Sequence, residues 1–305
     1  MNINNISNTY QMSSPYSVIL CDLWGVVHNG KEIFQKSRDF LKRVKDDGKK
    51  VVLISNAPRP NSVVEDQLSN KLGLSNDLYD LIVTSGDITA NFLNSKSFGK
   101  NYYHLGPVKD KDLLNRISLE QKDNLNLADF VLCTGIDDDD LETASDYDDI
   151  LNEMKKLRLS MVCANPDKIV YRGNKKIDCA GALALNYENM SGKVKYFGKP
   201  YVEIYDYILN NLQIANPKIT KKDLLAIGDS FSTDVLGANN FDIDILFIRS
   251  GIHSEDILST NDIEKVAKNY LPNLPLELTT AEYLWAKLRY LQIIKKFLND
   301  FIIHH

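Results

Sequence analysis

Short apolar runs alternate with helix-like segments along this chain, and each run ends in a polar or glycine-containing loop. The clearest runs are Val18–Cys21, Val51–Ile54, Leu81–Val83, Leu224–Ile227 and Ile245–Ile248. Between the first two runs, residues 32–47 carry apolar side chains at helical spacing, and Gly48 suits the end of a helix. Strands that alternate with helices at this spacing favour βαβ units and a parallel sheet. The sequence therefore predicts an α/β protein.

The middle of the chain, residues 87–190, continues this alternation with new candidate strands. They are Tyr102–Leu105, Phe130–Cys133 and Met161–Cys163. None of them leads into an aspartate loop like the one that Asp22 opens after Val18–Cys21. We therefore interpret the middle as an inserted α/β domain.

Composition excludes several classes of protein. A chain of 305 residues is long enough for two domains, and 44% apolar with 25% charged residues is typical of a soluble globular protein. The net charge of −5 gives no reason to expect nucleic acid or an anionic membrane as the main partner. We also find no secretory signal and no stretch of ~20 apolar residues that would span a membrane.

Cysteine usage and the chain end add two expectations. The cysteines form no CxxC pair and are predicted to be buried free thiols, which suits a reducing, cytoplasmic location; they are Cys21, Cys133, Cys163 and Cys179. Residues 280–303 carry five apolar side chains at helical spacing, which predicts a helix packed on its own domain. The alternative is a dimerisation surface, which leaves a homo-oligomer open.

Several polar residues at the ends of predicted strands suit phosphoryl transfer. Asp22 could accept a phosphoryl group as an aspartyl phosphate. Ser55 can donate its hydroxyl to a phosphate oxygen, and the Lys199 ammonium suits the charge on transferring phosphoryl oxygens. Each residue alone is also explained as a helix N-cap or a turn residue.

Two further acids follow a later predicted strand. Asp229 comes directly after Gly228, and Asp234 lies about one helical turn further on. Together with Asp22 they would form a carboxylate-rich, all-oxygen site, which is the preference of magnesium. The joint order of these features carries more weight than any one of them.

That order resembles the haloacid dehalogenase superfamily of aspartate-nucleophile hydrolases over about residues 16–251. The matching motifs are Asp22-Leu23-Trp24-Gly25-Val26, Ile54-Ser55-Asn56, Gly198-Lys199-Pro200 and Gly228-Asp229-Ser230 with Asp234. Matches at Thr84–Gly86, Ala164–Asp167 and Cys179–Ala182 point to the NagD-like subgroup, class IIA. The resemblance implies a three-layer Rossmann-like core with a parallel sheet, residues 1–86 and 191–305, and an inserted α/β cap domain, residues 87–190.

The resemblance also implies roles for individual residues. Asp22 would be the nucleophile and a Mg²⁺ ligand, with the backbone carbonyl of Trp24 and the carboxylate of Asp229 as further ligands. Asp234 would orient a metal-bound water.

The phosphoryl group would be bound by Ser55 and Asn56, and Lys199 would neutralise its charge. The substrate would be a small phosphorylated metabolite. Cap residues that would select it are Asn165, Arg172 and Asp178.

The chain departs from the family pattern at Trp24, where family phosphatases usually have an aspartate that protonates the leaving oxygen and then activates water. Indole has no acid–base function near neutral pH, and loss of such a group typically costs ~10²–10⁴ in rate. Three alternatives follow: a slow or specialised phosphatase for leaving groups that need no proton, a phosphatase that uses His28 as a substitute acid or base, or a non-catalytic metabolite-binding or regulatory protein. Hydrolysis through an aspartyl phosphate is the leading prediction.

Overall fold

The computed structural model describes residue 10, residues 13–95, 98–173, 175–257, 259 and 262–272, and the backbone of 279–281 and 291–292. The chain divides into two compact units. The first comprises Met1–Ile54, Leu72–Leu81 and Leu209–His305, and the second comprises Ser55–Lys71 and Ile82–Ile208. Since the second unit also includes residues 55–71, 82–86 and 191–208, the predicted cap boundaries at 87 and 190 stay a prediction.

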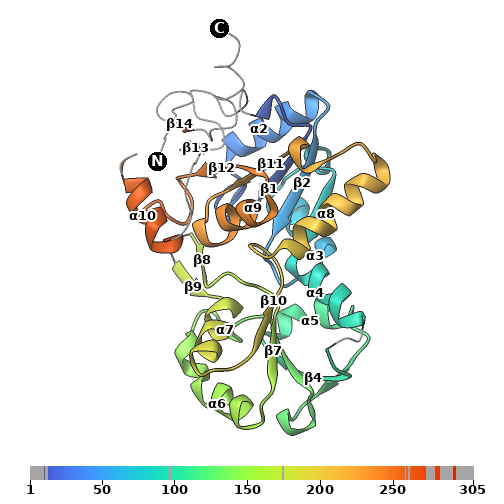
Figure 1. The fold of residues 1–305 in the computed structure, drawn as a ribbon, viewed down its shortest axis with the longest axis vertical. Coiled ribbons are helices and arrows are strands. Elements are labelled where there is room, and N and C mark those ends of the chain that lie inside the picture. Colours follow the sequence, from blue (N-terminus) through green and yellow to red (C-terminus); the bar gives the residue numbers. More distant parts are fainter. Residues whose placement is uncertain are drawn as a thin grey trace. The chain divides into compact units, whose positions relative to one another are not determined.

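The first unit contains most of a sheet with the strand order β14-β13-β12-β11-β1-β2-β3 (Figure 1), of which Ser55 in β2 and residues 82–84 in β3 fall in the second unit. The bounds are β1 (Val18–Asp22), β2 (Lys50–Ser55), β3 (Leu81–Thr84), β11 (Leu224–Gly228), β12 (Asp244–Ile248), β13 (Thr279–Ala281) and β14 (Leu291–Gln292). Strand β1 pairs in parallel with both β2 and β11, and β12 pairs in parallel with β11 and β13. Only the β13–β14 pair is antiparallel among the pairings recorded for these strands. The predicted parallel sheet is therefore present.

The burial of β1 explains why its sequence is continuously apolar. Val18, Ile19, Leu20 and Cys21 are at most 1% exposed, as expected for a strand covered on both faces of a parallel sheet. Helix α2 (Gln35–Asp46) buries residues at helical spacing, namely Phe40, Leu41 and Val44, within the range predicted as a helix. The other helices of this unit are α9 (Leu236–Phe241) and α10 (Asp262–Tyr270), and α8 (Val202–Ala215) begins in the second unit and ends in the first.

The second unit contains a five-stranded, fully parallel sheet with the order β10-β7-β6-β4-β5. Figure 1 labels its strands β4, β7 and β10. Its strands are β4 (Asn101–Leu105), β5 (Glu120–Lys122), β6 (Phe130–Cys133), β7 (Ser160–Cys163) and β10 (Val194–Tyr196). Its helices are α3 (Asn61–Asp66), α4 (Ser85–Asn94), α5 (Lys111–Leu114), α6 (Asp148–Lys156) and α7 (Ala180–Asn189). A separate antiparallel hairpin joins β8 (Ile169–Arg172) to β9 (Lys175–Asp178).

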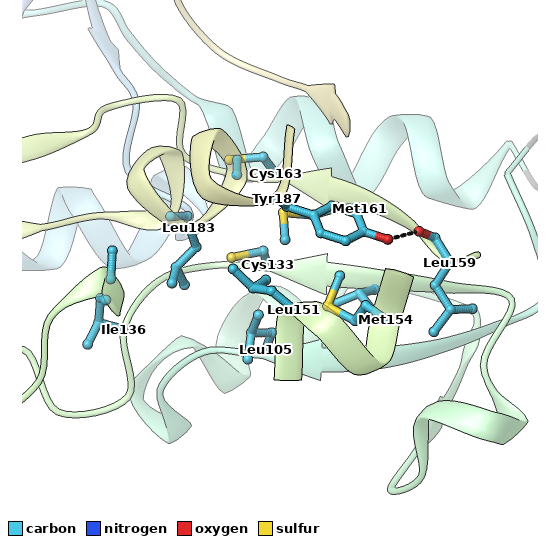
Figure 2. Packing of buried hydrophobic residues seen from close by; sticks show 14 of the residues in the cluster. Leu105, Cys133, Ile136, Leu151, Met154, Leu159, Met161, Cys163, Leu183 and Tyr187 are labelled. Atoms are coloured by element: carbon cyan, nitrogen blue, oxygen red, sulfur yellow. Dashed lines mark hydrogen bonds between the residues drawn. The ribbon is translucent and has the colours of Figure 1, made fainter. Parts of the chain in front are cut away.

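The core of the second unit lies between its sheet and helices α6 and α7, as Figure 2 shows. Met154 on α6 and Leu183 on α7 are fully buried against strand residues such as Met161. The Tyr187 hydroxyl donates a hydrogen bond of 2.5 Å to the carbonyl of Leu159, so its polar end is satisfied inside the core. All four cysteines lie in the described ranges, where none forms a disulfide and all are buried, as the sequence predicted.

Two features differ from the predictions or fall outside the described residues. The hairpin β8–β9 and the strands β5 and β10 were not predicted, although every strand predicted from the sequence is present. The helix expected over 280–303 falls mostly outside the described residues, and the parts of it that are described lie in β13 and β14, which are strands. No helix in the described ranges is long and apolar enough to cross a membrane.

Candidate functional site

Three acids from two neighbouring strands of the first unit converge at one edge of its sheet. Asp22 is the last residue of β1, and Asp229 directly follows β11. Cys21 is the register partner of Ile227, so both acids leave the sheet side by side. Asp22, Asp229 and Asp234 each offer an oxygen within 4.8 Å of the others, and all three are buried. The structure therefore brings together the three acids that the sequence singled out.

The electrostatics of this acid cluster favour a bound cation. Two carboxylates 4.8 Å apart repel by about 3 kcal/mol at an effective dielectric constant near 20. A divalent ion would replace this repulsion with attraction. The donor set is entirely oxygen, which fits magnesium better than zinc or copper. These residues therefore fit the predicted Mg²⁺ ion.

Glycines let the backbone approach these acids closely. A Cβ at Gly25 would lie 2.0 Å from Oδ2 of Asp229, and Gly25 also has a φ of +87°, which disfavours other residues. A Cβ at Gly251 would lie 1.8 Å from the same oxygen. The Trp24–Gly25 backbone therefore passes directly beside Asp229, which is where the resemblance places a carbonyl ligand.

Backbone amides fix the orientation of two of the acids. The amides of Asp229 and Ser230 both donate to Oδ2 of Asp234, each at 3.1 Å. The amide of Ile252 donates to Oδ2 of Asp229 at 2.7 Å. Asp234 thus organises the turn that carries Asp229, and its role in orienting a metal-bound water stays a prediction. No sequence motif pointed to Ile252, although a glycine, Gly251, precedes it.

Trp24, the residue at the position of the usual acid, is held by its own loop. A Cβ at Gly30 would lie 2.7 Å from the indole, so the ring packs directly on the Gly30 backbone. His28 meets the indole edge to face, with ring centroids 5.1 Å apart. The Trp24 side chain is therefore a fixed part of this loop.

His28 has a packing role in the same loop. Its Nδ1 accepts the Gly30 amide at 3.0 Å, and its carbonyl accepts the Gly25 amide at 2.8 Å. Burial lowers the pKa of His28 to about 4, so the ring is neutral near pH 7, with its proton on Nε2. A neutral ring whose acceptor nitrogen is already occupied is a poor acid or base. This geometry favours a packed histidine over a substitute catalytic group.

The predicted lysine lies in the second unit, where a single amide side chain fixes its backbone. Lys199 is 3% exposed. Oδ1 of Asn56 accepts the Lys199 amide at 2.7 Å, and Nδ2 of Asn56 donates to the Lys199 carbonyl at 3.0 Å and to Oδ1 of Asp167 at 2.8 Å. Gly198 leaves no room for a side chain here, because its Cβ would lie 2.6 Å from Oδ1 of Asn56. Asn56 therefore positions Lys199, and its side-chain amide has no donor left for a phosphoryl group.

The remaining predicted residues have local partners. Ser55 is the last residue of β2, and its hydroxyl oxygen accepts the Ala57 amide at 3.2 Å. Its neighbour Ile54 is the register partner of Asp22. Asn165 accepts the Asp167 amide at 3.0 Å and so shapes the turn after β7. The contact between Asp167 and Asn56 was not expected from the sequence.

Two predicted cap residues bind the loop beside the hairpin β8–β9. Arg172 forms an ion pair of 2.7 Å with Asp139, and Asp178 accepts the Ala144 amide at 3.0 Å. Lys175 pairs with Asp140 at 2.5 Å. These contacts tie the hairpin to residues 139–144, and a role in substrate selection for Arg172 and Asp178 stays a prediction.

Two family models and several known proteins match this chain. Residues 19–120 match the model of the haloacid dehalogenase-like hydrolase family, and residues 196–274 match a second model described as HAD-hydrolase-like. The ribonucleotide monophosphatase NagD of Escherichia coli K12 is 27% identical over 244 residues, which are 78% of this chain and 89% of that protein. An acid sugar phosphatase of Staphylococcus saprophyticus is 23% identical over 81% of this chain and 92% of its own. The crystal structure of a haloacid dehalogenase-like hydrolase from Brucella suis 1330 is 35% identical, with a TM-score of 0.78, and covers 83% of this chain and 95% of its own.

Proposed function

This chain belongs to the haloacid dehalogenase-like hydrolase family, and on that premise we propose that it is a magnesium-dependent phosphatase that forms an aspartyl phosphate on Asp22. The observation that carries the proposal is the convergence of three buried acids within 4.8 Å. Asp22 and Asp229, with the Trp24 carbonyl, would hold the ion, and Asp234 would orient a bound water. Magnesium in this place supplies positive charge that neutralises phosphoryl oxygens.

The reaction proceeds in two steps on this chain's residues. An oxygen of Asp22 attacks phosphorus, and the bond to the leaving oxygen breaks with its electron pair on that oxygen. Water then attacks the phosphorus of the aspartyl phosphate, which releases inorganic phosphate and restores the carboxylate. The family resemblance assigns the Ser55 hydroxyl and the Lys199 ammonium to the charged oxygens, which these groups would bind in both steps. Asn56 contributes by holding the Lys199 backbone in place.

The identity of residue 24 limits the substrate. With an indole in place of a carboxylic acid, no side chain at this position donates a proton to the departing oxygen. Hydrolysis is then fastest for esters or anhydrides whose leaving group is stable as an anion, such as acyl phosphates and phosphates of acidic alcohols. We propose a small phosphorylated metabolite of that class as the substrate, with slow turnover of ordinary sugar phosphates.

A second function is favoured by the fixed Trp24 loop and the neutral, buried His28. A protein that keeps the acid cluster but lacks a proton shuttle suits a metabolite-binding or regulatory role. In that case phosphate compounds would bind in a magnesium-dependent way without turnover.

A leaving-group series separates these functions. Phosphate release from substituted phenyl phosphates is measured with Mg²⁺ and with a chelator, for the native chain and for Asp22→Asn, Trp24→Asp and Trp24→Asn. We expect Asp22→Asn to abolish release, and the native rate to rise steeply with leaving-group acidity. Trp24→Asp should flatten this dependence and accelerate the poorest leaving groups by up to ~10²–10⁴, the usual worth of a general acid.

Trp24→Asn is the matched control, because it has the shape of aspartate but no acid. Equal gains in both variants would mean that space, not a proton, was missing. Magnesium-dependent binding of inorganic phosphate without release from any ester would instead support the binding protein.

A further inference from the structure

The loop after β12 contacts the turn that carries Asp229, although no sequence motif marked it. We propose that His253 is a positioning residue that holds the Asp229 turn in its metal-binding arrangement by accepting the amide of Phe231. The proposal rests on the magnesium site of the proposed function. It concerns residues of the first unit only.

His253 supplies the hydrogen-bond acceptor for one backbone amide of this turn. The turn has three consecutive amides, at Asp229, Ser230 and Phe231. The first two donate to Asp234, and the third donates to Nε2 of His253 at 3.3 Å. A buried amide without an acceptor destabilises the folded state. Of the side chains in the described part of the chain that accept these three amides, His253 alone lies outside the turn.

The histidine is itself held from several directions. It is 3% exposed, and its ring packs against Phe231 and Tyr270 with centroid separations of 4.9 and 4.7 Å. Its Nδ1 lies 4.0 Å from the carboxylate of Asp256. Because Nε2 accepts a hydrogen bond, the ring proton lies on Nδ1, on the Asp256 side. The contacts therefore fix both the place and the tautomer of the ring.

The same loop also touches the carboxylate. Ile252, the neighbour of His253, donates its amide to Oδ2 of Asp229 at 2.7 Å, and Gly251 leaves no space for Asp229 to move toward it. The loop that carries His253 therefore holds Asp229 through two hydrogen bonds. The Ile252 amide binds the Asp229 side chain, and His253 binds the Phe231 amide in the turn that carries Asp229. Partners that orient metal ligands in this way typically contribute ~10–100-fold in metal affinity.

Three variants test the proposal. His253→Phe keeps the ring packing but removes the acceptor, and His253→Asn keeps a polar group that is too short to reach the Phe231 amide. His253→Gln restores an acceptor at the reach of Nε2. Tyr270→Phe, which retains the ring that packs on His253, is the matched control.

The readouts are Mg²⁺ affinity by calorimetry on the substrate-free protein, amide hydrogen exchange of Phe231 and Ile252 without metal, and Tm without metal. We expect His253→Phe and His253→Asn to weaken Mg²⁺ binding ~10–100-fold and to expose the Phe231 amide to exchange. His253→Gln and Tyr270→Phe should stay within about threefold of the native affinity, about 0.7 kcal/mol or less.

The outcomes separate this inference from the proposed function. Native Mg²⁺ affinity in His253→Phe and His253→Asn, with the Phe231 amide exposed to exchange, would overturn the positioning role alone. Equal weakening by Tyr270→Phe would overturn it as well, because that variant keeps both the ring packing and the His253 acceptor, so the loss would not depend on the hydrogen bond to Phe231. Absence of Mg²⁺ binding in the native chain would overturn both the proposed function and this inference.

Discussion

The acid cluster implies that one of its own members destabilises the protein when no metal is bound. Each pair of carboxylates 4.8 Å apart repels by about 3 kcal/mol at an effective dielectric constant near 20. Asp22→Asn removes two of the three pairs. Because protonation and water relieve part of this repulsion, we expect a net gain of about 1–2 kcal/mol, the usual range for relaxing a functional site. That corresponds to a Tm rise of about 2–8 °C in a chelator.

The effect of Asp22→Asn on Tm should reverse its sign when magnesium is added. The native chain gains stability from the ion, by about 2.7 kcal/mol at a hundred times the dissociation constant. The Asp22→Asn variant loses a ligand and should gain much less, so its Tm should fall below that of the native chain.

Thermal unfolding with and without Mg²⁺ measures both effects, with Asp46→Asn as the control. Asp46 is 64% exposed on α2, and its substitution should change stability by less than about 0.5 kcal/mol in either condition. A lower Tm for Asp22→Asn in the chelator would refute the reasoning, because it would mean that the native carboxylate is stabilising without a cation. A Tm that ignores Mg²⁺ in the native chain would do the same.

Three further predictions follow from the same contacts. Gly251→Ala should weaken Mg²⁺ binding, because its Cβ would lie 1.8 Å from a carboxylate oxygen of Asp229. Gly48→Ala, at a φ of +76° in open space, should lower Tm and leave Mg²⁺ affinity unchanged, and calorimetry with thermal unfolding compares the two variants. Asn56→Ala should lower kcat for any phosphate ester that the native chain hydrolyses, with a smaller effect on Tm, because the backbone of Lys199 loses two hydrogen bonds. An unchanged kcat would contradict the positioning of Lys199 by Asn56. The free energy of unfolding should fall as pH drops from about 6.5 to about 4, because burial lowers the pKa of His28 to about 4 in the folded state and the unfolded chain therefore binds the proton more readily. Urea unfolding at several pH values measures this dependence, and His28→Asn should weaken it.

The parts of the site that sequence could predict depend on sheet geometry. Asp22 and Asp229 follow apolar runs, and parallel strands bring such residues to one edge whatever the loops do. By contrast, the partner of Asn56 lies 143 residues away, and no local pattern indicates that its amide binds a backbone instead of a phosphate. The contact between Ile252 and Asp229 was missed for the same reason.

Other misses concern local signals that were present but weak. The hairpin β8–β9 has apolar, β-branched residues in Ile169–Arg172 followed by Gly173 and Asn174, which is a hairpin signal in the sequence. The charged residues of β9 hide it. Arg172 looked suited to a substrate, and its ion pair with Asp139 depends on the tertiary placement of an acidic loop.

The packing of Trp24 on Gly30 also provides an optical probe. The chain contains only two tryptophans, at positions 24 and 285, and one of them lies in the loop that passes beside Asp229. Indole emission responds to nearby charge and solvent, so filling the acid cluster should change the fluorescence of the native protein. Substituting Trp285 with phenylalanine would leave Trp24 as the sole emitter, so that ion occupancy could be followed by titration without a label.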